Sequence, residues 1–237
     1  MYRIPKSPFK FYGPRVCCSF IYFTEIVVLY LIMEKFDLVI IGAHNGLGLE
    51  EFILKQKNKV LLIEPVNYNL KSLKNRFKDI NNIIFENVGV SDEKKQLKFY
   101  YVKESSVKKL SKEWGSGIGS FKKKHLLDHH RKRFQITERD IEEVDIKIVV
   151  FKDLVEKYNI GEIEYLLIDA EGYDYQIIKS VDFNKTKINK VKFEYKHLDD
   201  TFKFDIRLLE LREMFNQLNY KEIDIDNENI TFEKIAI

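Results

Sequence analysis

Short apolar runs alternate along this chain with stretches in which apolar residues recur at helical spacing. Buried strands are expected at five of these runs, namely 36–41, 60–63, 83–85, 165–168 and 190–195. Helices are expected at 47–57, 68–77, 152–158, 173–181 and 205–218. This alternation predicts an α/β fold with a parallel sheet covered by helices on both faces. Two expected strands after the last helix, 221–225 and 230–237, indicate an antiparallel hairpin at the sheet edge.

The middle of the chain is less regular than its two ends. Residues 96–102 are expected to form a strand that is hairpinned to 88–90, and residues 144–150 an edge strand. The polar and basic segment 103–135 lacks a clean period and contains three glycines. Because a long irregular insert beside an active site is often a mobile cover, we expect an insert or lid at about 103–135.

Composition excludes several classes of protein. Of the 237 residues, 45% are hydrophobic, so the chain can bury a core and wholesale disorder is excluded. The net charge of only +3 does not indicate general attraction to nucleic acid. The only two cysteines are the adjacent Cys17 and Cys18, which excludes a disulfide framework and a cysteine-built zinc site.

A turn rich in small residues follows the first expected strand and opens the first helix. It reads Gly42-Ala43-His44-Asn45-Gly46-Leu47-Gly48, and it holds three of the ten glycines in the chain. Small residues let a ligand approach the backbone, and a helix N-terminus offers free N–H groups. The spacing is neither G-x-G-x-x-G nor G-x-x-x-x-G-K-[ST], so the turn suits a nucleoside without a pyrophosphate. The alternative interpretation is that the small residues are needed only for packing and that the turn binds no ligand.

Polar side chains also follow the second and third expected strands. Glu64 ends the second strand, 22 residues after Gly42, where a carboxylate can accept both hydroxyls of a ribose. After the third strand, a side chain at Glu86 or Asn87 is a candidate for contact with an adenine edge. A solvated loop residue is the alternative for Glu64, and a plain turn is the alternative for residues 86 and 87.

A second cluster of small and acidic residues, Asp169-Ala170-Glu171-Gly172, follows the strand at 165–168. Ligands bind outside the carboxyl ends of strands in open α/β sheets. Asp169 and Glu171 are therefore expected to face one cleft beside a cationic or polyhydroxylated ligand. The alternative is that one of these residues, Glu171 in particular, caps the helix that begins at residue 173.

These residues together carry a resemblance to the FkbM family of S-adenosylmethionine-dependent methyltransferases. The turn at 41–46 resembles the strand–GAN-x-G turn of the family, Glu64-Pro65 its E-P, and residues 87–92 its N-x-A-x-S-D stretch. The sequence Ile168-Asp169-Ala170-Glu171-Gly172 matches its I-D-x-E-G hallmark, and Phe193-Glu194 its later strand end. The chain departs from the family pattern at Ile40, at His44 in place of asparagine, and at Gly89 in place of alanine.

The resemblance implies a Rossmann-like class I methyltransferase with a doubly wound, mostly parallel seven-stranded sheet and an antiparallel C-terminal hairpin. It implies S-adenosyl-L-methionine as cofactor and no metal, with methyl transfer to a hydroxyl of a sugar, a glycan or a small natural product. The cofactor-binding residues would be Gly42, Ala43, His44, Asn45, Gly46, Glu64, Asn87 and Asp169. Asp169 and Glu171 would line the methyl-transfer side as catalytic residues. Candidates for a general base are Asp169, Glu171, Glu194, His125, His129, His130 and His197.

Other enzymes share this fold outline. A nicotinamide-dependent oxidoreductase would have a different glycine spacing. A nucleic-acid or protein methyltransferase would perform the same reaction on another acceptor, although we expect no nucleic acid as partner. A binding module without activity is a third alternative, which titration with S-adenosylmethionine would distinguish.

The N-terminal segment differs from the rest of the chain. Residues 16–33 are mostly apolar over 18 residues, the minimum length for a membrane span, and Glu25 lies near their centre. The basic residues precede this segment, so insertion would place 34–237 outside the cytoplasm, away from a cofactor made in the cytosol. We therefore interpret 1–33 as an extension that is non-native, dispensable or packed on the methyltransferase domain 34–237. We expect a cytoplasmic protein, with a membrane anchor at 16–33 as the disfavoured alternative.

Overall fold

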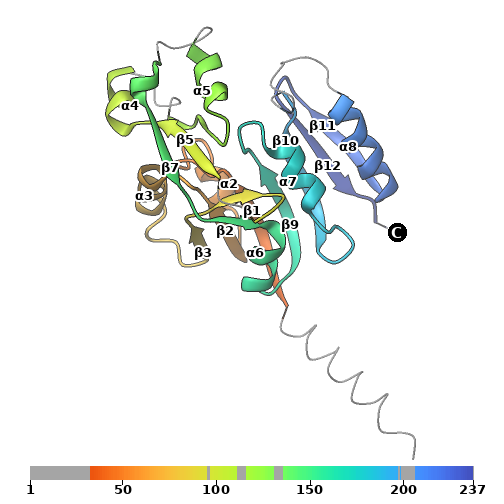
Figure 1. Cartoon of the computed structure of the whole chain (residues 1–237). Helices are drawn as coiled ribbons and strands as arrows, with labels where there is room; N and C mark the ends of the chain where they lie inside the picture. Colours follow the sequence, from red (N-terminus) through yellow and green to blue (C-terminus); the bar gives the residue numbers. More distant parts are fainter. Residues whose placement is uncertain are drawn as a thin grey trace, which may run out of the picture. The chain divides into compact units, whose positions relative to one another are not determined.

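The computed structural model describes residues 33–94, 97–110, 116–130, 136–196, 198 and 206–236, without the side chains of 109–110 and 128–130. A seven-stranded sheet forms its centre, in the order β11-β12-β10-β9-β1-β2-β3 (Figure 1). These strands are β1 (Glu34–Ile41), β2 (Lys59–Ile63), β3 (Ile83–Glu86), β9 (Ile160–Ile168), β10 (Lys187–Glu194), β11 (Tyr220–Ile225) and β12 (Asn229–Lys234). All neighbours pair in parallel except β12, which pairs antiparallel with β10 and β11. The prediction of a mostly parallel sheet with an antiparallel C-terminal hairpin is confirmed.

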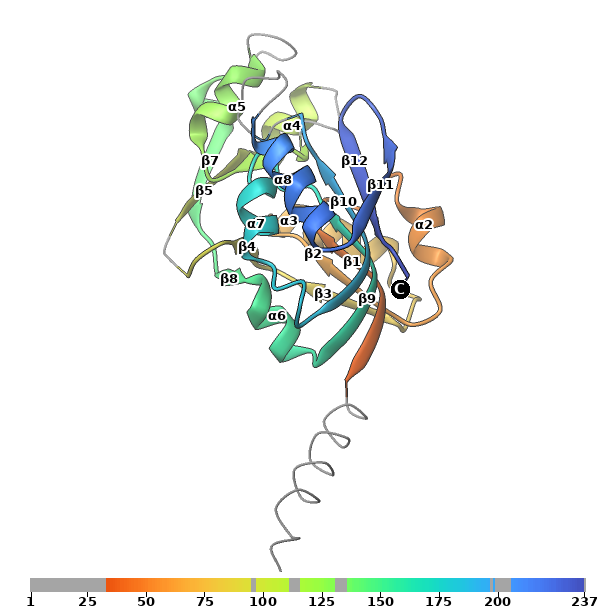
Figure 2. The same cartoon turned by 90° about the vertical axis from the view of Figure 1, so that its right-hand side faces the viewer.

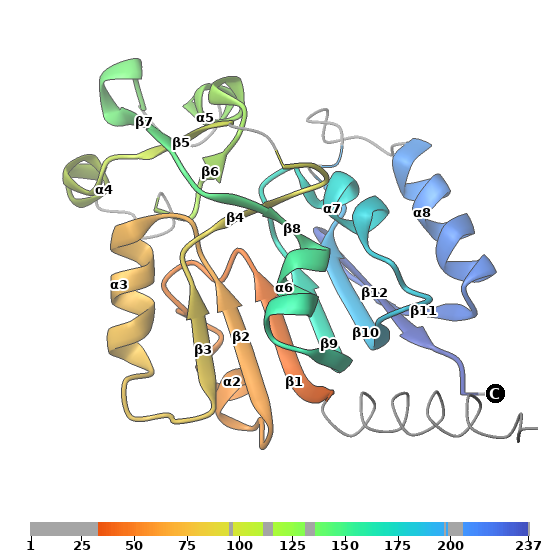
Figure 3. The ribbon, with the colours of Figure 1, turned by 60° about the horizontal axis from the view of Figure 1, so that its bottom comes forward.

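Helices cover both faces of this sheet. One face packs against α6 (Phe151–Lys157), α7 (Asp174–Ser180) and α8 (Ile206–Gln217), and the other against α2 (Glu50–Leu54) and α3 (Asn67–Arg76). Along β1, Leu38 and Ile40 point to the α2–α3 side, whereas Val39 and Ile41 point to the opposite side. The two helical layers are seen on opposite sides of the strands in Figures 2 and 3. A central strand buried on both faces needs a continuous apolar run, which is the pattern that the sequence shows.

The parallel strands end side by side. Ile41 pairs with Ile63 of β2 and with Ile168 of β9, and Ile168 in turn pairs with Phe193 of β10. The loops that follow these strands therefore start from one row at the same edge of the sheet. This register places the glycine-rich turn, Glu64 and the Asp169–Glu171 segment close together, as expected for an open α/β sheet.

The first helix after the glycine-rich turn is shorter than its apolar pattern predicts. It begins at Glu50 rather than at residue 47 because Gly46 and Gly48 take φ angles of 76° and 82°, in the left-handed region. It ends at Leu54, after which the main-chain N–H groups of residues 57 and 58 donate to the Asp37 carboxylate at 2.9 and 2.7 Å.

The middle of the chain forms two small sheets. β4 (Gly89–Ser91) pairs in parallel with β8 (Ile148–Val150), and β5 (Lys98–Val102) pairs antiparallel with β6 (Gly119–Ser120) and β7 (Ile141–Asp145). The expected hairpin of 96–102 with 88–90 is therefore wrong, and the expected strand 144–150 is divided between two sheets. The chain turns at Ile146, whose side chain fills the space beside Gly89: a Cβ atom on Gly89 would lie 2.6 Å from Ile146 Cδ1.

The insert is folded where the structure describes it. It contributes α4 (Glu104–Leu110), β6 and α5 (Lys123–His130), and a short 3-10 helix, η2 (Glu138–Asp140), follows it. Val102, Ile118, Leu126, Ile136 and Ile141 form a separate small core beneath these elements. In Figure 1, α4 and α5 lie above the strand ends of the central sheet. The insert thus carries side chains to the edge where the site is expected.

In the described part of the chain, no helix is both long enough and apolar enough to cross a membrane. The apolar segment 16–33 lies outside the described residues except for Met33.

Candidate functional site

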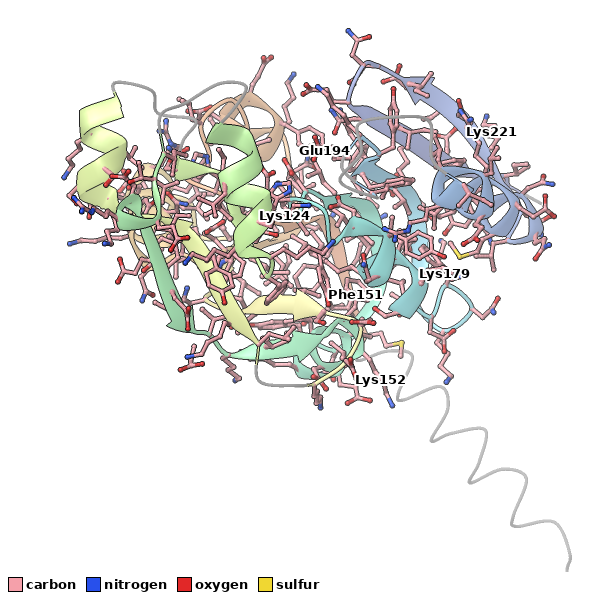
Figure 4. The ribbon with its side chains drawn as sticks, turned by 45° about the horizontal axis from the view of Figure 1, so that its top comes forward. Lys124, Phe151, Lys152, Lys179, Glu194 and Lys221 are labelled. Atoms are coloured by element: carbon pink, nitrogen blue, oxygen red, sulfur yellow. The ribbon has the colours of Figure 1, made fainter. Side chains whose placement is uncertain are left out.

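A cavity opens at the carboxyl ends of β1, β2 and β9. It encloses about 700 Å³ of empty space, counted to its open mouth. Its walls come from four regions: the glycine-rich turn, the loops after β2 and β9, the segment 88–90 with Phe99, and the insert. Figure 4 looks toward this end of the sheet, with Glu194 at the end of β10 and Lys124 on α5. Segments that are distant from one another in sequence therefore border one space.

The glycine-rich turn is held against the neighbouring strand ends. The N–H groups of Gly42 and Ala43 donate to the Ile63 carbonyl at 3.0 and 2.9 Å. Gly42 has φ 86°, and a Cβ atom there would lie 1.8 Å from the Asp169 carbonyl oxygen, so only glycine fits this position. Gly42 and His44 line the cavity. Ala43, Asn45 and Gly46 do not line it: Ala43 is buried, Asn45 accepts the Leu47 N–H, and Gly46 packs against α3.

Glu64 is buried at the end of β2, with 4% of its surface exposed, and it lines the cavity. Its Oε2 accepts the main-chain N–H of His44 at 2.9 Å, and its Oε1 accepts that of Val66 at 2.8 Å. Burial raises the pKa of Glu64 to about 7, against which the hydrogen bonds from Val66, His44 and Asn69 act. The carboxylate is thus fixed in direction by three donors, and it keeps acceptor capacity for a ligand hydroxyl at the cavity wall.

His44 connects the turn to the insert. It adopts φ 50°, and its Nε2 hydrogen bonds with the Ser116 hydroxyl. The amide of Asn69, on α3, donates to the Ser116 carbonyl at 2.8 Å. Burial lowers the pKa of His44 to about 4, so its imidazole is neutral at physiological pH. The glycine-rich turn and α3 together hold Ser116, near the middle of the insert, against the cavity.

Carboxyl groups gather at the ends of β9 and β10. Asp169 lines the cavity and is exposed to it, with protein atoms packed around its carboxyl group. Burial, together with the charges of Glu171, Asp174 and Glu194, raises its pKa well above the ordinary value. Asp174 is fully buried, and its oxygens accept the N–H groups of Ala170 at 3.2 Å and Glu194 at 3.4 Å. Burial and Glu194 raise the pKa of Asp174 as well.

Glu171 does not cap a helix. Helix α7 begins at Asp174 with Tyr173 as its N-cap residue and no side-chain cap. Glu171 instead takes φ 48° and lines the cavity, and its Oε2 lies 3.1 Å from Nε2 of His125 on α5. The Ser120 hydroxyl donates to the Glu171 carbonyl at 3.3 Å. Asp169 and Glu171 therefore face one cavity, as their spacing predicted.

The two candidates after β3 have other partners. The Asn87 amide donates to the carbonyls of Glu64 and Pro65, both at 2.9 Å, and so fastens the end of β3 to the loop after β2. Although burial acts to raise the pKa of Glu86, hydrogen bonds from Lys157 and Tyr158 lower it. Neither side chain lines the cavity, whose wall here is formed by residues 88–90.

Several lining residues were not expected from the sequence. Phe99 and Phe121 line the cavity with their ring centroids 5.3 Å apart, and Phe121 packs against Tyr173 at 4.8 Å. Gly117 and Gly119 lie on the same side. The cluster of glycines at 115–119 was the one signal that could have placed this part of the insert at the site.

The remaining sequence candidates are placed as follows. Glu194 lies at the end of β10, next to Asp174. The side chains of His129 and His130, and all of His197, lie outside what the structure describes. Among the described residues, no group of three histidine, cysteine, aspartate or glutamate side chains is arranged to hold a metal ion.

The charge of the cavity wall has one sign. The ionisable side chains among its described lining residues are Glu64, Asp169, Glu171 and the neutral His44, and no lysine or arginine is among them. Acidic groups in a low-dielectric cleft favour a cation and repel an anion. Such a wall suits a positively charged ligand and opposes a pyrophosphate.

Comparison with known proteins gives one family. A model of that family, described as the methyltransferase FkbM domain, matches residues 41–222. No curated protein matches the chain.

Solved structures provide further comparisons. Methyltransferase FkbM from Methylobacillus flagellatus KT is similar with a TM-score of 0.50 and 16% identity, over 85% of this chain and 43% of that chain. A putative methyltransferase from Streptococcus mutans, SMU.1697c in complex with SAH, has a TM-score of 0.44 and 11% identity, over 90% of this chain and 97% of that one. An rRNA methylase from Streptococcus thermophilus has a TM-score of 0.41 and 11% identity, over 91% and 96%. The chain thus spans less than half of the M. flagellatus protein, and the likeness to that structure concerns the fold.

Proposed function

This chain belongs to the FkbM methyltransferase domain family, and we propose on that premise that it transfers the methyl group of S-adenosylmethionine to a hydroxyl group. The proposed acceptor is a sugar, a glycan or a small natural product. The match covers only 43% of the M. flagellatus protein, so the acceptor of that protein is not carried over to this chain. The proposed acceptor is argued from the cavity of this chain.

The acidic cavity is the observation that carries the proposal. S-adenosylmethionine bears a sulfonium and an ammonium group, and the wall offers Glu64, Asp169 and Glu171 without a lysine or arginine among its described residues. A nicotinamide dinucleotide would bring a pyrophosphate into the same space. The charge of the wall and the family membership both oppose the oxidoreductase alternative. The same absence of basic residues among the described lining offers no support for a nucleic-acid acceptor.

The residues present fit the cofactor. Gly42, Gly89, Gly117, Gly119 and Ala170 line the wall, and at Gly42 a Cβ atom would meet the Asp169 carbonyl, so the turn can pack this closely beside the cavity only with glycine there. Glu64 would accept the ribose hydroxyls with the lone pairs that its two backbone donors leave free. Val66 and residues 88–90 would form the apolar wall beside the adenine, with Asn87 holding that wall in place. Gly42, His44 and Asp169 would bound the end that holds the methionine portion.

When bound, the cofactor supplies an electrophilic methyl group for in-line displacement. The protein then needs to align an acceptor oxygen with that methyl carbon and to exclude water. Phe99 and Phe121, whose rings meet edge to face, provide an apolar surface, and Asp169 and Glu171 provide hydrogen-bond acceptors for a polyhydroxylated molecule. A sugar ring presents both an apolar face and hydroxyl groups, which is why we favour it as the acceptor.

Two titrations test the proposal. Calorimetry of the purified chain with S-adenosylhomocysteine and, separately, with NAD⁺ should show binding of the first and none of the second. A mass spectrum of small molecules that co-purify with the protein gives an independent readout. The proposal fails if the folded chain binds neither S-adenosylhomocysteine nor S-adenosylmethionine.

Acceptor class is tested with S-adenosylmethionine labelled in its methyl group. Label should enter methyl hexopyranosides or a polar metabolite extract rather than RNA or protein. Label found only in RNA or protein would overturn the acceptor class and leave the cofactor assignment standing.

A further inference from the structure

A buried histidine of the insert contacts a carboxylate of the cavity wall. His125, on α5, places Nε2 3.1 Å from Oε2 of Glu171, which lies 46 residues further along the chain. The His125 side chain is only 3% exposed, whereas that of Glu171 is 22% exposed and lines the cavity. The insert also holds the Glu171 main chain through the Ser120 hydroxyl. The Glu171 carboxylate therefore faces the cavity, and the His125 imidazole, which does not line the cavity, contacts it from the protein side.

From this contact we propose that Glu171 receives the proton of the acceptor hydroxyl and that His125 positions the Glu171 carboxylate for that step. The inference rests on the proposed methyl transfer. Glu171 is the catalytic residue in this assignment because it borders the space in which the acceptor would lie. His125 is a positioning residue because it acts through Glu171.

The proton and electron balance is complete without another reactant. A new bond forms between the acceptor oxygen and the methyl carbon, and the bond between that carbon and sulfur breaks. The electron pair of the broken bond remains on sulfur, which becomes a neutral thioether. The hydroxyl proton moves to Glu171, whose carboxylate becomes a carboxylic acid and later returns the proton to solvent.

The neighbouring ionisable groups are less suited to this role. Asp169 also faces the cavity, but burial and three nearby carboxyl groups raise its pKa, so it holds a proton more readily before the reaction begins. His44 has its pKa lowered to about 4 by burial and is therefore a weak base. Its Nε2 is hydrogen bonded to Ser116. Asp174 is fully buried and accepts two main-chain N–H groups, so the acceptor cannot reach it.

The main chain at Glu171 supports a fixed geometry. A non-glycine residue at φ 48° is uncommon, because the left-handed region is strained for a residue with a Cβ atom. Residues in such conformations persist where their surroundings hold them, often at functional sites. Here the surroundings include Ser120 and His125, both from the insert. The reacting carboxylate is thereby oriented only when the insert is folded against β9.

The first test does not need an acceptor. In the complex with S-adenosylhomocysteine, the ring N–H of His125 should give a proton resonance far downfield of the amide region, because it donates to a charged carboxylate. This resonance should be absent in His125→Gln and should move upfield in Glu171→Gln. A His125 ring resonance that is the same in the wild type and in Glu171→Gln would overturn the pairing.

The second test separates this role from cofactor binding. Glu171→Gln and His125→Gln should bind S-adenosylhomocysteine within about threefold of the wild type. A loss of more than about tenfold in either variant would assign the pair to the cofactor and overturn the proposal. If the wild type itself does not bind S-adenosylhomocysteine, the proposed function fails instead, so the two failures are distinguishable.

The third test uses transfer of labelled methyl to methyl hexopyranosides. Glu171→Gln should lower kcat at least about 100-fold with little change in the KM for S-adenosylmethionine, consistent with loss of a general base. His125→Gln, whose amide can still donate to Glu171, should retain more activity than His125→Leu, which cannot. Equal kcat values for the wild type and Glu171→Gln, or for His125→Gln and His125→Leu, would overturn the assignment. If none of these sugars accepts methyl, the first two tests decide.

Discussion

Replacing Glu64 by glutamine tests the ribose assignment with the smallest change of shape. Both oxygens of Glu64 already accept a main-chain N–H, from His44 and Val66, and the carboxylate keeps acceptor capacity for ribose hydroxyl groups. In the glutamine variant one oxygen becomes an NH₂ group, which cannot accept, and the remaining bond loses its charge. Hydrogen bonds to charged groups contribute about 1.5–3 kcal/mol each. The expected loss is about 2–4 kcal/mol, or roughly 30-fold to 1,000-fold in affinity for S-adenosylhomocysteine.

Calorimetry at pH 8 measures this loss, because the carboxylate is then largely ionised. Glu162→Gln is the matched control: Glu162 lies near the start of β9, at the opposite end of the sheet, where it pairs with Lys35 and Lys187 at 2.9 Å each. The control should bind S-adenosylhomocysteine as the wild type does. The ribose assignment is refuted if folded Glu64→Gln binds within threefold of the wild type.

The pH dependence gives a second measurement on the same pair of proteins. Burial raises the pKa of Glu64 from an ordinary 4.5 to about 7, so the folded state binds this proton more tightly than the unfolded state. The resulting stability is fully present below pH 4.5 and is lost as pH rises through 7; it corresponds to about 3 kcal/mol. Denaturant unfolding of the wild type between pH 4.5 and 8 should show this loss, whereas Glu64→Gln should lack it. Parallel pH profiles would contradict the raised pKa. Cofactor affinity should change in the opposite direction and weaken below pH 7, by up to about tenfold per pH unit.

Other substitutions test the fold around the site. Gly42→Ala should lower the free energy of unfolding in urea by about 2–5 kcal/mol, because its Cβ atom would lie 1.8 Å from the Asp169 carbonyl oxygen. Gly48→Ala has open space around the new Cβ atom and should lower it by only about 1–2 kcal/mol, because of its φ of 82°. Equal costs would refute the close approach. Phe215→Ala should cost about 3–5 kcal/mol, since this ring is fully buried. The buried Asp174 carboxyl has a raised pKa and therefore lowers the stability of the folded state as pH rises, so Asp174→Asn should show a smaller loss of stability with rising pH. A pH profile identical to that of the wild type would contradict the raised pKa. Deletion of residues 1–32 should leave the affinity for S-adenosylhomocysteine unchanged, since no described lining residue precedes 41; a tenfold loss would show that the segment takes part in binding.

Local patterns were sufficient for the central sheet and for part of the site. A strand segment such as 38–41 that is buried on both faces must be apolar throughout, so its position can be read from the residues themselves. Because parallel strands end at one edge, the order of motifs along the chain predicts that Gly42, Glu64 and Asp169 meet there. The structure brings these three residues to one cavity. Ala43, Asn45 and Gly46 share the same motif but do not line this cavity: Ala43 is buried, Asn45 accepts the Leu47 N–H, and Gly46 lies against Leu73 and Phe77.

Strand pairing in the middle of the chain could not be predicted in the same way. Residues 98–102 have the pattern of a strand, but that pattern does not specify a partner. Residues 88–90 and 141–145 are both suitable, and the structure pairs 98–102 with the second. The choice depends on packing between distant residues, such as Ile146 beside Gly89. The partners of Glu86 could not be predicted from local sequence either. Its position at a strand end suggested a ligand contact, but its carboxylate binds Lys157 and Tyr158, about 70 residues away along the chain.

The fold class, the family and the residues at the strand ends could be predicted from the sequence, because each depends on short-range periodicity or on short motifs. The residues of the insert that join them depend on tertiary packing. Ser116 contacts His44 across 72 positions of the chain, and His125 contacts Glu171 across 46. No local pattern encodes such pairs, since they arise when the small core of the insert packs and sets α5 against the end of β9. The carboxylates of the site were therefore visible in the sequence, whereas the groups that orient them became visible only in the folded chain.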